Sequence, residues 1–395
     1  MTPVIVKIAI VSETFPPEVN GVAMTFGTIA RELGRRGHEL KIYHPARDDL
    51  AEASRGQPYT QIPMPGLAIP GYPLLRLGWP AKTKLLRTWR RDRPDLVHVV
   101  TEGPLGASAV TAAGHLGIPV TSSFHTNFHA YTKDYGFPGL HGLVLWWLRR
   151  VHNRTRRTFA PTNELCDELS ALGFHSMGLL SRGIDVDCFS PERRSDELRR
   201  EWGADRDNPV VLHVGRMAPE KNYDLLFKIF AQMRTVNPTL RFVLAGEGPV
   251  KATLMKAHPE CHFAGFFSRE EIGRYYASAD IYIHASLSET FGNVLTEAMA
   301  SGLAVAGFDY AAGRQFVCHD KNGLLAPCDR PDQLIKEANR LATDGVLRER
   351  LRRAARSGFE QQSWSSVIER FERDLLIAAH SDGPNASRQL RAVST

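Results

Sequence analysis

Two glutamates eight residues apart bracket the stretch of sequence with the clearest chemical potential. Glu289 follows an apolar run expected to be a strand, and Glu297 lies about two turns into the helix that follows. The first N–H groups of a helix are unsatisfied and partly positive, so Gly292, Asn293 and Val294 form a natural phosphate cradle. Carboxylates beside a phosphate suit a sugar nucleotide, with hydroxyls on both the hexose and the ribose. Taken alone, the spacing also fits a helix-capping acid and a surface acid.

These residues need a scaffold that presents several loops at one edge, and the sequence predicts one. Short apolar runs alternate with helical segments twice, first from Val4–Val11 onward and again from Val210–Val214 onward. This alternation predicts an α/β protein of two doubly wound parallel sheets, with ligands beyond the carboxyl ends of the strands. Residues 56–80, rich in proline and glycine, are expected to form irregular loop.

The length of 395 residues suffices for two domains. We expect an N-terminal acceptor domain over residues 1–185 and a donor domain over residues 186–362. A helix over residues 363–380 is expected to pack back towards the first domain, and residues 381–395 to form a disordered tail. With two sheets facing each other, the cleft between them is the expected ligand site.

The segment SETFGNVLTEAMASGLAVAG closely resembles the signature of family-four glycosyltransferases, and the resemblance covers nearly the whole chain. It implies the GT-B architecture, two Rossmann-like domains with an inter-domain cleft. It also implies a retaining reaction that moves a hexosyl group from GDP-mannose or a UDP-hexose to an acceptor, with no cofactor. The resemblance assigns Glu289 to catalysis, and Phe291 and Glu297 to donor binding together with the cradle. Two further phrases, HNRTRRTFAPT and SRGIDVDCFSP, resemble mannosyl, sulfoquinovosyl and glucosyl transferases with lipid acceptors.

A second match surrounds Arg216 and Lys221, which follow the strand expected at Val210–Val214. In the family, an arginine and a lysine five residues apart hold the donor diphosphate. Two fixed cations stabilise the negative charge that grows on this leaving group, so no divalent metal is expected. The sequence Asp185-Val186-Asp187 has the letters of a metal motif but lies in the expected linker, and we discount it.

Four further positions come from the resemblance. Gly21, in the loop after the first strand, lets the backbone approach the donor. His125, after the strand expected at Pro119–Ser123, is implied to contact the donor sugar near the reacting centre. Gly246 belongs to a loop beside the donor, and Ala264 to the segment whose backbone reads the base.

The composition indicates in which cellular compartment the protein works. Five cysteines, none with C-x-x-C spacing, argue against a disulfide framework or zinc site and favour a reduced, cytoplasmic chain. The apolar stretch over residues 1–11 is too short for a secretory signal. No uncharged apolar run reaches 18 residues, so any membrane contact is expected to be peripheral. We expect a monomer or weak dimer that binds a nucleotide sugar and a lipid or glycan acceptor, but no nucleic acid.

The net charge of +6 is concentrated in the first half of the chain. Residues 76–93 hold seven basic residues against one acid, and residues 149–157 hold five arginines and no acid. Tryptophans lie beside both patches, as at a bilayer interface. The patches therefore predict peripheral contact with an anionic membrane, at the inner face of the cell membrane. An ordinary solvated face is the interpretation that stays open beside it.

Two other functions stay open. A non-hydrolysing sugar-nucleotide epimerase shares the architecture, but no acid–base constellation for elimination can be identified. A catalytically inactive peripheral membrane-binding protein would account for the basic patches. It would not account for the intact set of Glu289, Glu297, Arg216, Lys221 and His125.

Overall fold

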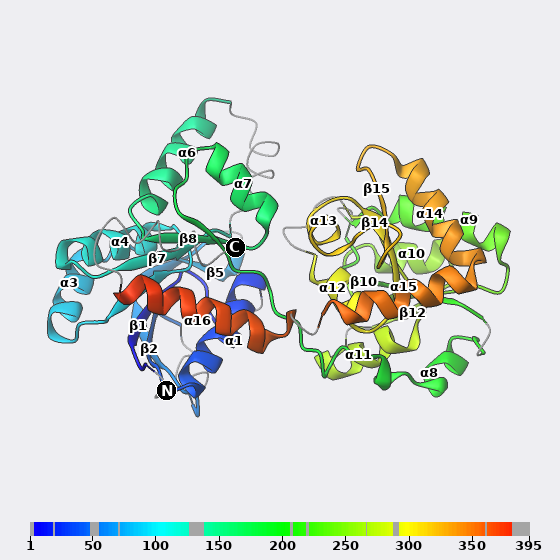
Figure 1. Ribbon diagram of the computed structural model, residues 1–395, viewed down its shortest axis with the longest axis horizontal. Helices are drawn as coiled ribbons and strands as arrows, with labels where there is room; N and C mark the ends of the chain where they lie inside the picture. Colours follow the sequence, from blue (N-terminus) through cyan, green and yellow to red (C-terminus); the bar gives the residue numbers. More distant parts are fainter. Residues whose placement is uncertain are drawn as a thin grey trace. The chain divides into compact units, whose positions relative to one another are not determined.

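The computed structural model describes ten stretches of the chain: residues 4–18, 20–47, 55–69, 72–125, 138–205, 208–218, 221–265, 267–286, 292–359 and 362–380. It divides into two compact units, here called unit 1 and unit 2. Unit 1 comprises Met1–Ser181 and Val367–Thr395, and unit 2 comprises Arg182–Ser366. Each unit is built on one parallel sheet with helices on both faces (Figure 1).

The sheet of unit 1 has the order β3-β2-β1-β6-β7-β8-β9, and every neighbouring pair is parallel. Its strands are β1 (Lys7–Val11), β2 (Glu39–Pro45), β3 (Thr60–Met64), β6 (Leu96–Val99), β7 (Val120–Ser123), β8 (Arg157–Ala160) and β9 (Met177–Leu179). The order runs outward in both directions from β1 and β6. The carboxyl edge between these two strands is therefore the switch point of the sheet.

Helices cover both faces of this sheet. They are α1 (Gly21–Arg35), α3 (Lys82–Arg91), α4 (Pro104–Leu116), α6 (Pro138–His152) and α7 (Asn163–Ala171). On one face, Leu105 and Ala109 of α4 pack with Val97 of β6 in a single buried cluster. Successive side chains of a strand point to opposite faces of the sheet, so each strand contributes residues to the helix layers on both faces.

The last described helix, α16 (Trp364–His380), packs on the other face of unit 1 beside α1 (Figure 1). The ring of Phe371 lies 5.0 Å from Phe159 of β8 and 5.2 Å from His98 of β6, between ring centroids. Phe26 of α1 completes the group at 6.5 Å. The carboxylate of Glu372 also pairs with Arg36, at 2.5 Å. The end of the chain thus supplies part of the core of unit 1. The expected tail, residues 381–395, lies outside the described residues.

The prediction of irregular loop over residues 56–80 is wrong. Three strands lie there: β3 on the edge of the main sheet, and an antiparallel hairpin of β4 (Gly66–Ile69) and β5 (Tyr72–Gly78). Pro63 can occupy β3 because an edge strand has one side free of ladder hydrogen bonds. The glycines and prolines that suggested loop therefore mark an edge strand and a short hairpin.

Unit 2 has the strand order β12-β11-β10-β13-β14-β15, again parallel throughout, which is the order of a dinucleotide-binding fold. Its strands are β10 (Val210–Val214), β11 (Arg241–Ala245), β12 (His262–Ala264), β13 (Ile281–His284), β14 (Ala304–Phe308) and β15 (Leu324–Ala326). The switch point lies between β10 and β13.

Two buried clusters, one on each face of this sheet, hold unit 2 together. One cluster includes α9 (Tyr223–Val236) and α14 (Pro331–Thr343), and the other includes α11 (Arg269–Ser278) and α12 (Asn293–Ala300). The remaining helices are η1 (Pro191–Arg193), α8 (Asp196–Glu201), α10 (Lys251–Ala257), α13 (Ala312–Phe316) and α15 (Gly345–Ser357). Among all the helices described in both units, none is long and apolar enough to cross a membrane.

Replacing Phe371 by alanine should destabilise unit 1 by about 3–5 kcal/mol, because it empties a space lined by three buried rings. Urea unfolding followed by tryptophan fluorescence would measure the loss. Arg373→Ala, an exposed position on the same helix, is the matched control and should change stability by less than about 0.5 kcal/mol. Equal midpoints for the two variants would contradict the docking of α16.

Candidate functional site

The loops after β10 and β13 emerge side by side at the carboxyl edge of unit 2, since the two strands are parallel neighbours. Arg216 follows β10, and Lys221 precedes α9. The side-chain amide of Asn222 donates to the carbonyl of Ala285, just after β13, at 3.2 Å. The segment that carries both predicted cations is therefore tied to the loop that leads to α12.

Backbone contacts fix the shape of the loop that carries Arg216. Gly215 N–H donates to Ala245 O at 3.0 Å, and Met217 N–H donates to Glu247 O at 2.8 Å. A Cβ on Gly246 would lie 2.0 Å from Gly215 O, and Gly246 has a φ of +146°. No residue but glycine fits there. Gly246, predicted as a donor-loop residue, thus holds the loops after β10 and β11 together.

The base-reading segment predicted around Ala264 joins the same edge. Ala264 is buried at the end of β12, beside Ala245 of β11. Gly246 N–H donates to the next carbonyl, that of Gly265, at 3.2 Å. Three consecutive strands of unit 2 therefore end in loops bonded to one another.

The N-terminus of α12 lies at the switch point and is open. Gly292 precedes the helix with a φ of +92°, a conformation that favours glycine, and no side chain of the described residues caps the helix. Asn293 is exposed and Val294 is half-buried, and the first N–H groups of a helix have no partner within it, which is what a phosphate cradle requires. Glu289 and Phe291 lie outside the described residues.

Glu297 lies in the second turn of α12, and its carboxylate accepts a hydrogen bond from the hydroxyl of Tyr276 on α11 at 3.0 Å. Burial raises the pKa of Glu297, while the Tyr276 hydroxyl and the Arg269 guanidinium pull the pKa back down. The acid predicted to bind donor hydroxyls is therefore held by a partner that the sequence did not reveal.

In unit 1, His125 follows β7 and is held by a stack of rings. Its imidazole meets the edge of Phe26 on α1 at 5.5 Å, and Phe26 stacks on His98 at 5.4 Å. His98 bonds Thr121 and Ser123 through its two ring nitrogens. Burial, and then the neighbouring His125, lower the pKa of His98 to about 3, so His98 is a neutral support.

Gly21 is the first residue of α1, and the loop before it is tightly bonded. Asn20 caps the helix by accepting from the N–H groups of Val22 and Ala23 at 3.1 and 2.9 Å. The same Asn20 side chain donates to Thr14 at 2.6 Å. Because Phe26 lies on this helix, α1 connects Gly21 with His125 within unit 1.

Asp185 of the discounted D-x-D sequence serves a turn. It accepts from the N–H of Cys188 at 3.0 Å and lies 3.6 Å from the guanidinium of Arg269. Within the described stretches, no three His, Cys, Asp or Glu side chains gather as metal ligands would.

Two family profiles match the chain, one for each part. The profile described as "Glycosyltransferase Family 4" matches residues 19–187, and "Glycosyl transferases group 1" matches residues 194–358. A GDP-mannose-dependent alpha-mannosyltransferase of Mycobacterium tuberculosis is 33% identical, over 92% of this chain and 94% of its own. The chain belongs to glycosyltransferase family 4.

Other relatives of this glycosyltransferase agree with its fold and class. An alpha-monoglucosyldiacylglycerol synthase of Streptococcus pneumoniae is 26% identical over 76% of this chain and 70% of its own. The structure of HepE from Anabaena in complex with UDP superposes with a TM-score of 0.74, covering 94% of this chain and 99% of that one at 19% identity. The predicted GT-B architecture of two Rossmann-like units is confirmed, and neither the epimerase nor the inactive binding protein is favoured.

The glycosyltransferase also holds a buried acid that sequence reasoning missed. Glu13 follows β1 at the switch point of unit 1, and its carboxylate accepts from the N–H of Leu105, in the first turn of α4, at 2.9 Å. The N–H of Gly78, at the end of β5, donates to the other oxygen. Its place directly after a buried strand was the signal available in the sequence.

Burial raises the pKa of Glu13 to about 7, from 4.5 in an unfolded chain, even though backbone N–H groups oppose the shift. The folded protein therefore holds this proton more tightly than the unfolded chain does. The resulting stabilisation is complete below pH 4.5 and is lost as the pH rises through 7.

Between pH 4.5 and 7.5 this group should lower the free energy of unfolding by up to about 3 kcal/mol. Glu13→Gln has no proton to lose, so its stability relative to wild type should rise by that amount over the same range. Urea titrations at both pH values would measure it, with Asp167→Asn, an exposed acid on α7, as control. A pH-independent difference between Glu13→Gln and wild type would refute the assignment.

Proposed function

We propose that this glycosyltransferase transfers mannose from GDP-mannose to a lipid acceptor, with retention of configuration and without a metal ion. The observation that carries the proposal is the convergence of the Arg216–Lys221 segment and the open end of α12 at the switch point of unit 2. The relatives named for GDP-mannose and for diacylglycerol support the donor and the acceptor class.

In the proposed reaction, the carboxyl edge of the unit 2 sheet stabilises the negative charge of the leaving diphosphate. Breaking the glycosidic bond transfers negative charge to the departing diphosphate. Arg216 and Lys221 supply fixed positive charges for it, and the N–H groups of Asn293 and Val294 supply oriented dipoles that need no reorganisation during the reaction. Together they replace the cation that a metal-dependent enzyme would use.

The remaining groups orient the donor. Glu289 and Glu297 accept hydrogen bonds from its hydroxyls, and Ala264 offers its backbone to the base. His125 and Gly21 are proposed as contacts to the donor sugar, on the strength of the family resemblance. The departing phosphate assists deprotonation of an acceptor that attacks from the same face, which retains the configuration. Proton NMR of the product should then show an α-mannoside formed from the α-configured donor.

Lys221→Ala should keep the fold and reduce turnover of GDP-mannose at least 100-fold, because one fixed cation at the leaving group is lost; a single electrostatic donor contributes about 10²–10³ in rate. Lys228→Ala, an exposed lysine on α9, is the matched control. Assays in excess EDTA with GDP-mannose and UDP-glucose would test donor and metal together.

Three results would count against the proposal. Wild-type turnover in Lys221→Ala would remove the assigned cation. Loss of wild-type activity in EDTA would contradict metal independence. Turnover of UDP-glucose alone would contradict GDP-mannose as the donor while leaving the site in place.

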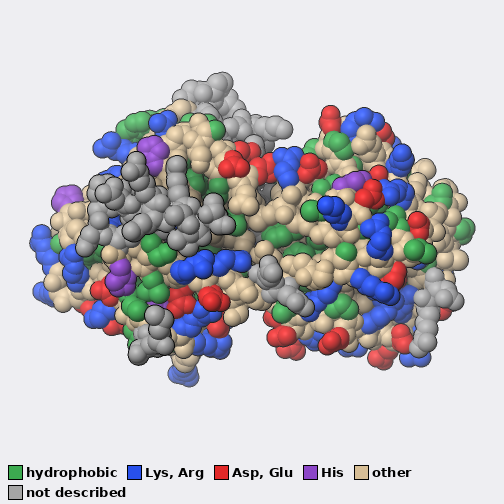
Figure 2. All heavy atoms as spheres, in the orientation of Figure 1, with side chains coloured by type: hydrophobic (Ala, Val, Ile, Leu, Met, Phe, Trp, Pro, Cys, Tyr) green, Lys and Arg blue, Asp and Glu red, His purple; other side chains and the backbone are tan. Residues whose placement is uncertain are grey.

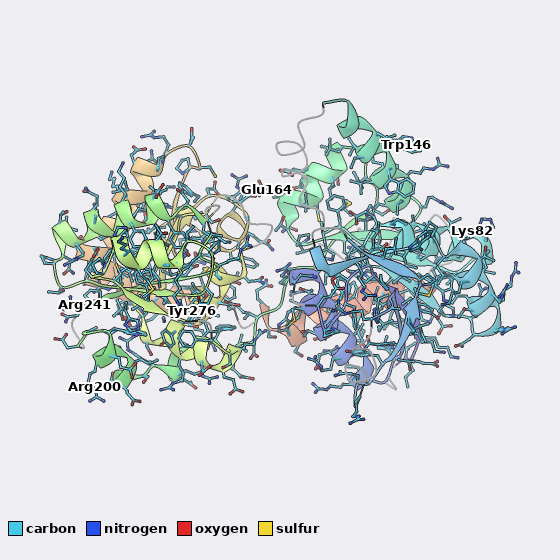
Figure 3. All side chains as sticks on the ribbon, turned by 180° about the vertical axis from the view of Figure 1, so that it is seen from behind. Lys82, Trp146, Glu164, Arg200, Arg241 and Tyr276 are labelled. Atoms are coloured by element: carbon cyan, nitrogen blue, oxygen red, sulfur yellow. The ribbon has the colours of Figure 1, made fainter. Side chains whose placement is uncertain are left out.

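The lipid acceptor is further supported by the surface of unit 1. Leu143, Trp146 and Trp147 project from α6 with 42–59% of their surface exposed, and Arg150 lies 5.4 Å from the Trp146 ring. Figure 2 shows hydrophobic and basic side chains together over α6 and basic ones over α3, and Figure 3 shows Trp146 and Lys82 pointing outward. Exposed tryptophan beside arginine suits a bilayer interface. No disulfide joins any of the five cysteines. We place the enzyme at the cytoplasmic face of an anionic membrane.

The protein should sediment with phosphatidylglycerol vesicles more than with phosphatidylcholine vesicles, and less as salt increases. Trp146→Ala should weaken the partitioning about tenfold, because it removes about half a tryptophan of insertable apolar surface. Met255→Ala, at an apolar residue on α10 of unit 2 that is also exposed, is the control. Equal recovery from both kinds of vesicle would contradict the membrane surface.

A further inference from the structure

Tyr276 is a buried residue on α11 whose hydroxyl meets an acid of the candidate site. Its side chain lies in the interior of unit 2 (Figure 3) and has no exposed surface. The hydroxyl donates to Oε2 of Glu297 on the neighbouring helix α12, at 3.0 Å. The bond joins two residues that are 21 positions apart in sequence, on helices that follow different strands.

The ring of Tyr276 is fixed, so the hydroxyl has a fixed direction. Phe189 packs edge-on against it at 5.6 Å, and Tyr282 of β13 lies 6.1 Å away, between ring centroids. Burial and the nearby Glu297 carboxylate raise the pKa of Tyr276 well above its ordinary value. The phenol therefore stays protonated and always acts as a donor.

When one oxygen of a carboxylate is held in this way, the other oxygen points in a fixed direction and can accept hydrogen bonds from a ligand. Tyr276 takes up a lone pair of Oε2, which stabilises the ionised form of a half-buried acid. Rotation of the Glu297 side chain would break this bond. The carboxylate is thus presented in one orientation, with acceptor capacity left for hydroxyls.

The position of Glu297 indicates which hydroxyls these are. Tyr276 ties Glu297 to α11, and α11 begins soon after Ala264, the proposed base-reading residue. The Arg269 guanidinium at the start of α11 also acts on Glu297. Because α11 follows the strand that ends at Ala264, we take the side of the phosphate cradle that faces α11 to be the base side, and the ribose of a bound nucleotide comes between base and phosphate.

We propose that Tyr276 is a positioning residue that orients the Glu297 carboxylate to accept both hydroxyls of the donor ribose. This inference rests on the proposed function, because it takes the nucleotide to be bound at this edge of unit 2. Tyr276 itself touches no substrate. The preference of the site for a ribose over a sugar that lacks the 2′- and 3′-hydroxyls nevertheless depends on this buried phenol.

The experiment compares binding of GDP with binding of 2′,3′-dideoxy-GDP by calorimetry. Wild type should prefer GDP, and Tyr276→Phe should lose about tenfold of this preference, since the affinity for GDP falls and that for the dideoxy compound does not. KM for GDP-mannose should rise more than kcat falls. Tyr275→Phe is the matched control on the same helix: its ring packs on Trp202 at 5.3 Å, away from Glu297, and its preference should equal that of wild type.

A double variant separates positioning from general packing. If Tyr276 acts through Glu297, Tyr276→Phe in the Glu297→Gln background should cause no further loss of preference for GDP. A further loss there, or an unchanged preference in the single variant, would overturn the inference. The proposed function fails separately, if wild type neither binds GDP nor turns over GDP-mannose; UDP and 2′,3′-dideoxy-UDP are the probes if wild type selects uridine.

Discussion

A diphosphate can be held by backbone N–H groups and fixed cations only where several loops emerge together, and a parallel sheet offers such a place where its strand order reverses. In unit 2 that place lies between β10 and β13. The bond from Asn222 to Ala285 draws the loop with the two cations against the loop that leads to α12. Gly246 and its neighbours then fix the loops behind them, backbone to backbone. The positions of these side chains follow from the order of the strands.

The two units treat their switch points differently. In unit 1 the first turn of α4 receives a carboxylate of the protein itself, because Glu13 accepts the N–H of Leu105. In unit 2 the corresponding end of α12 has no such internal acid among the described residues, and Gly292 leaves it accessible. One fold thus occurs in two forms within a single chain. In one the first turn of the helix is capped by an acid of the protein itself, and in the other it is available to an anionic ligand.

The sequence predicted the features that depend on neighbours along the chain. Apolar runs such as Val210–Val214 marked buried strands, and the position of Arg216 after one of them followed directly. Residues 56–80 were misassigned because an edge strand and a short hairpin tolerate glycine and proline. Tyr276 escaped notice for another reason: its importance depends on the packing of α11 against α12, and nothing near it in sequence refers to Glu297. Glu13 was missed because its place after a strand, the signal in the sequence, indicates neither its burial nor its bond to the first turn of α4.

The helix α16 has a consequence for how the protein is made. Phe371 completes the ring cluster of unit 1, yet it follows the whole of unit 2 in the sequence. All of unit 2 is synthesised before that ring becomes available. Until α16 has been made, the sheet of unit 1 lacks part of the layer on one face, and Phe26 and Phe159 lack one of their packing partners. The sequence of unit 2 is therefore complete before that of unit 1, although unit 1 begins first.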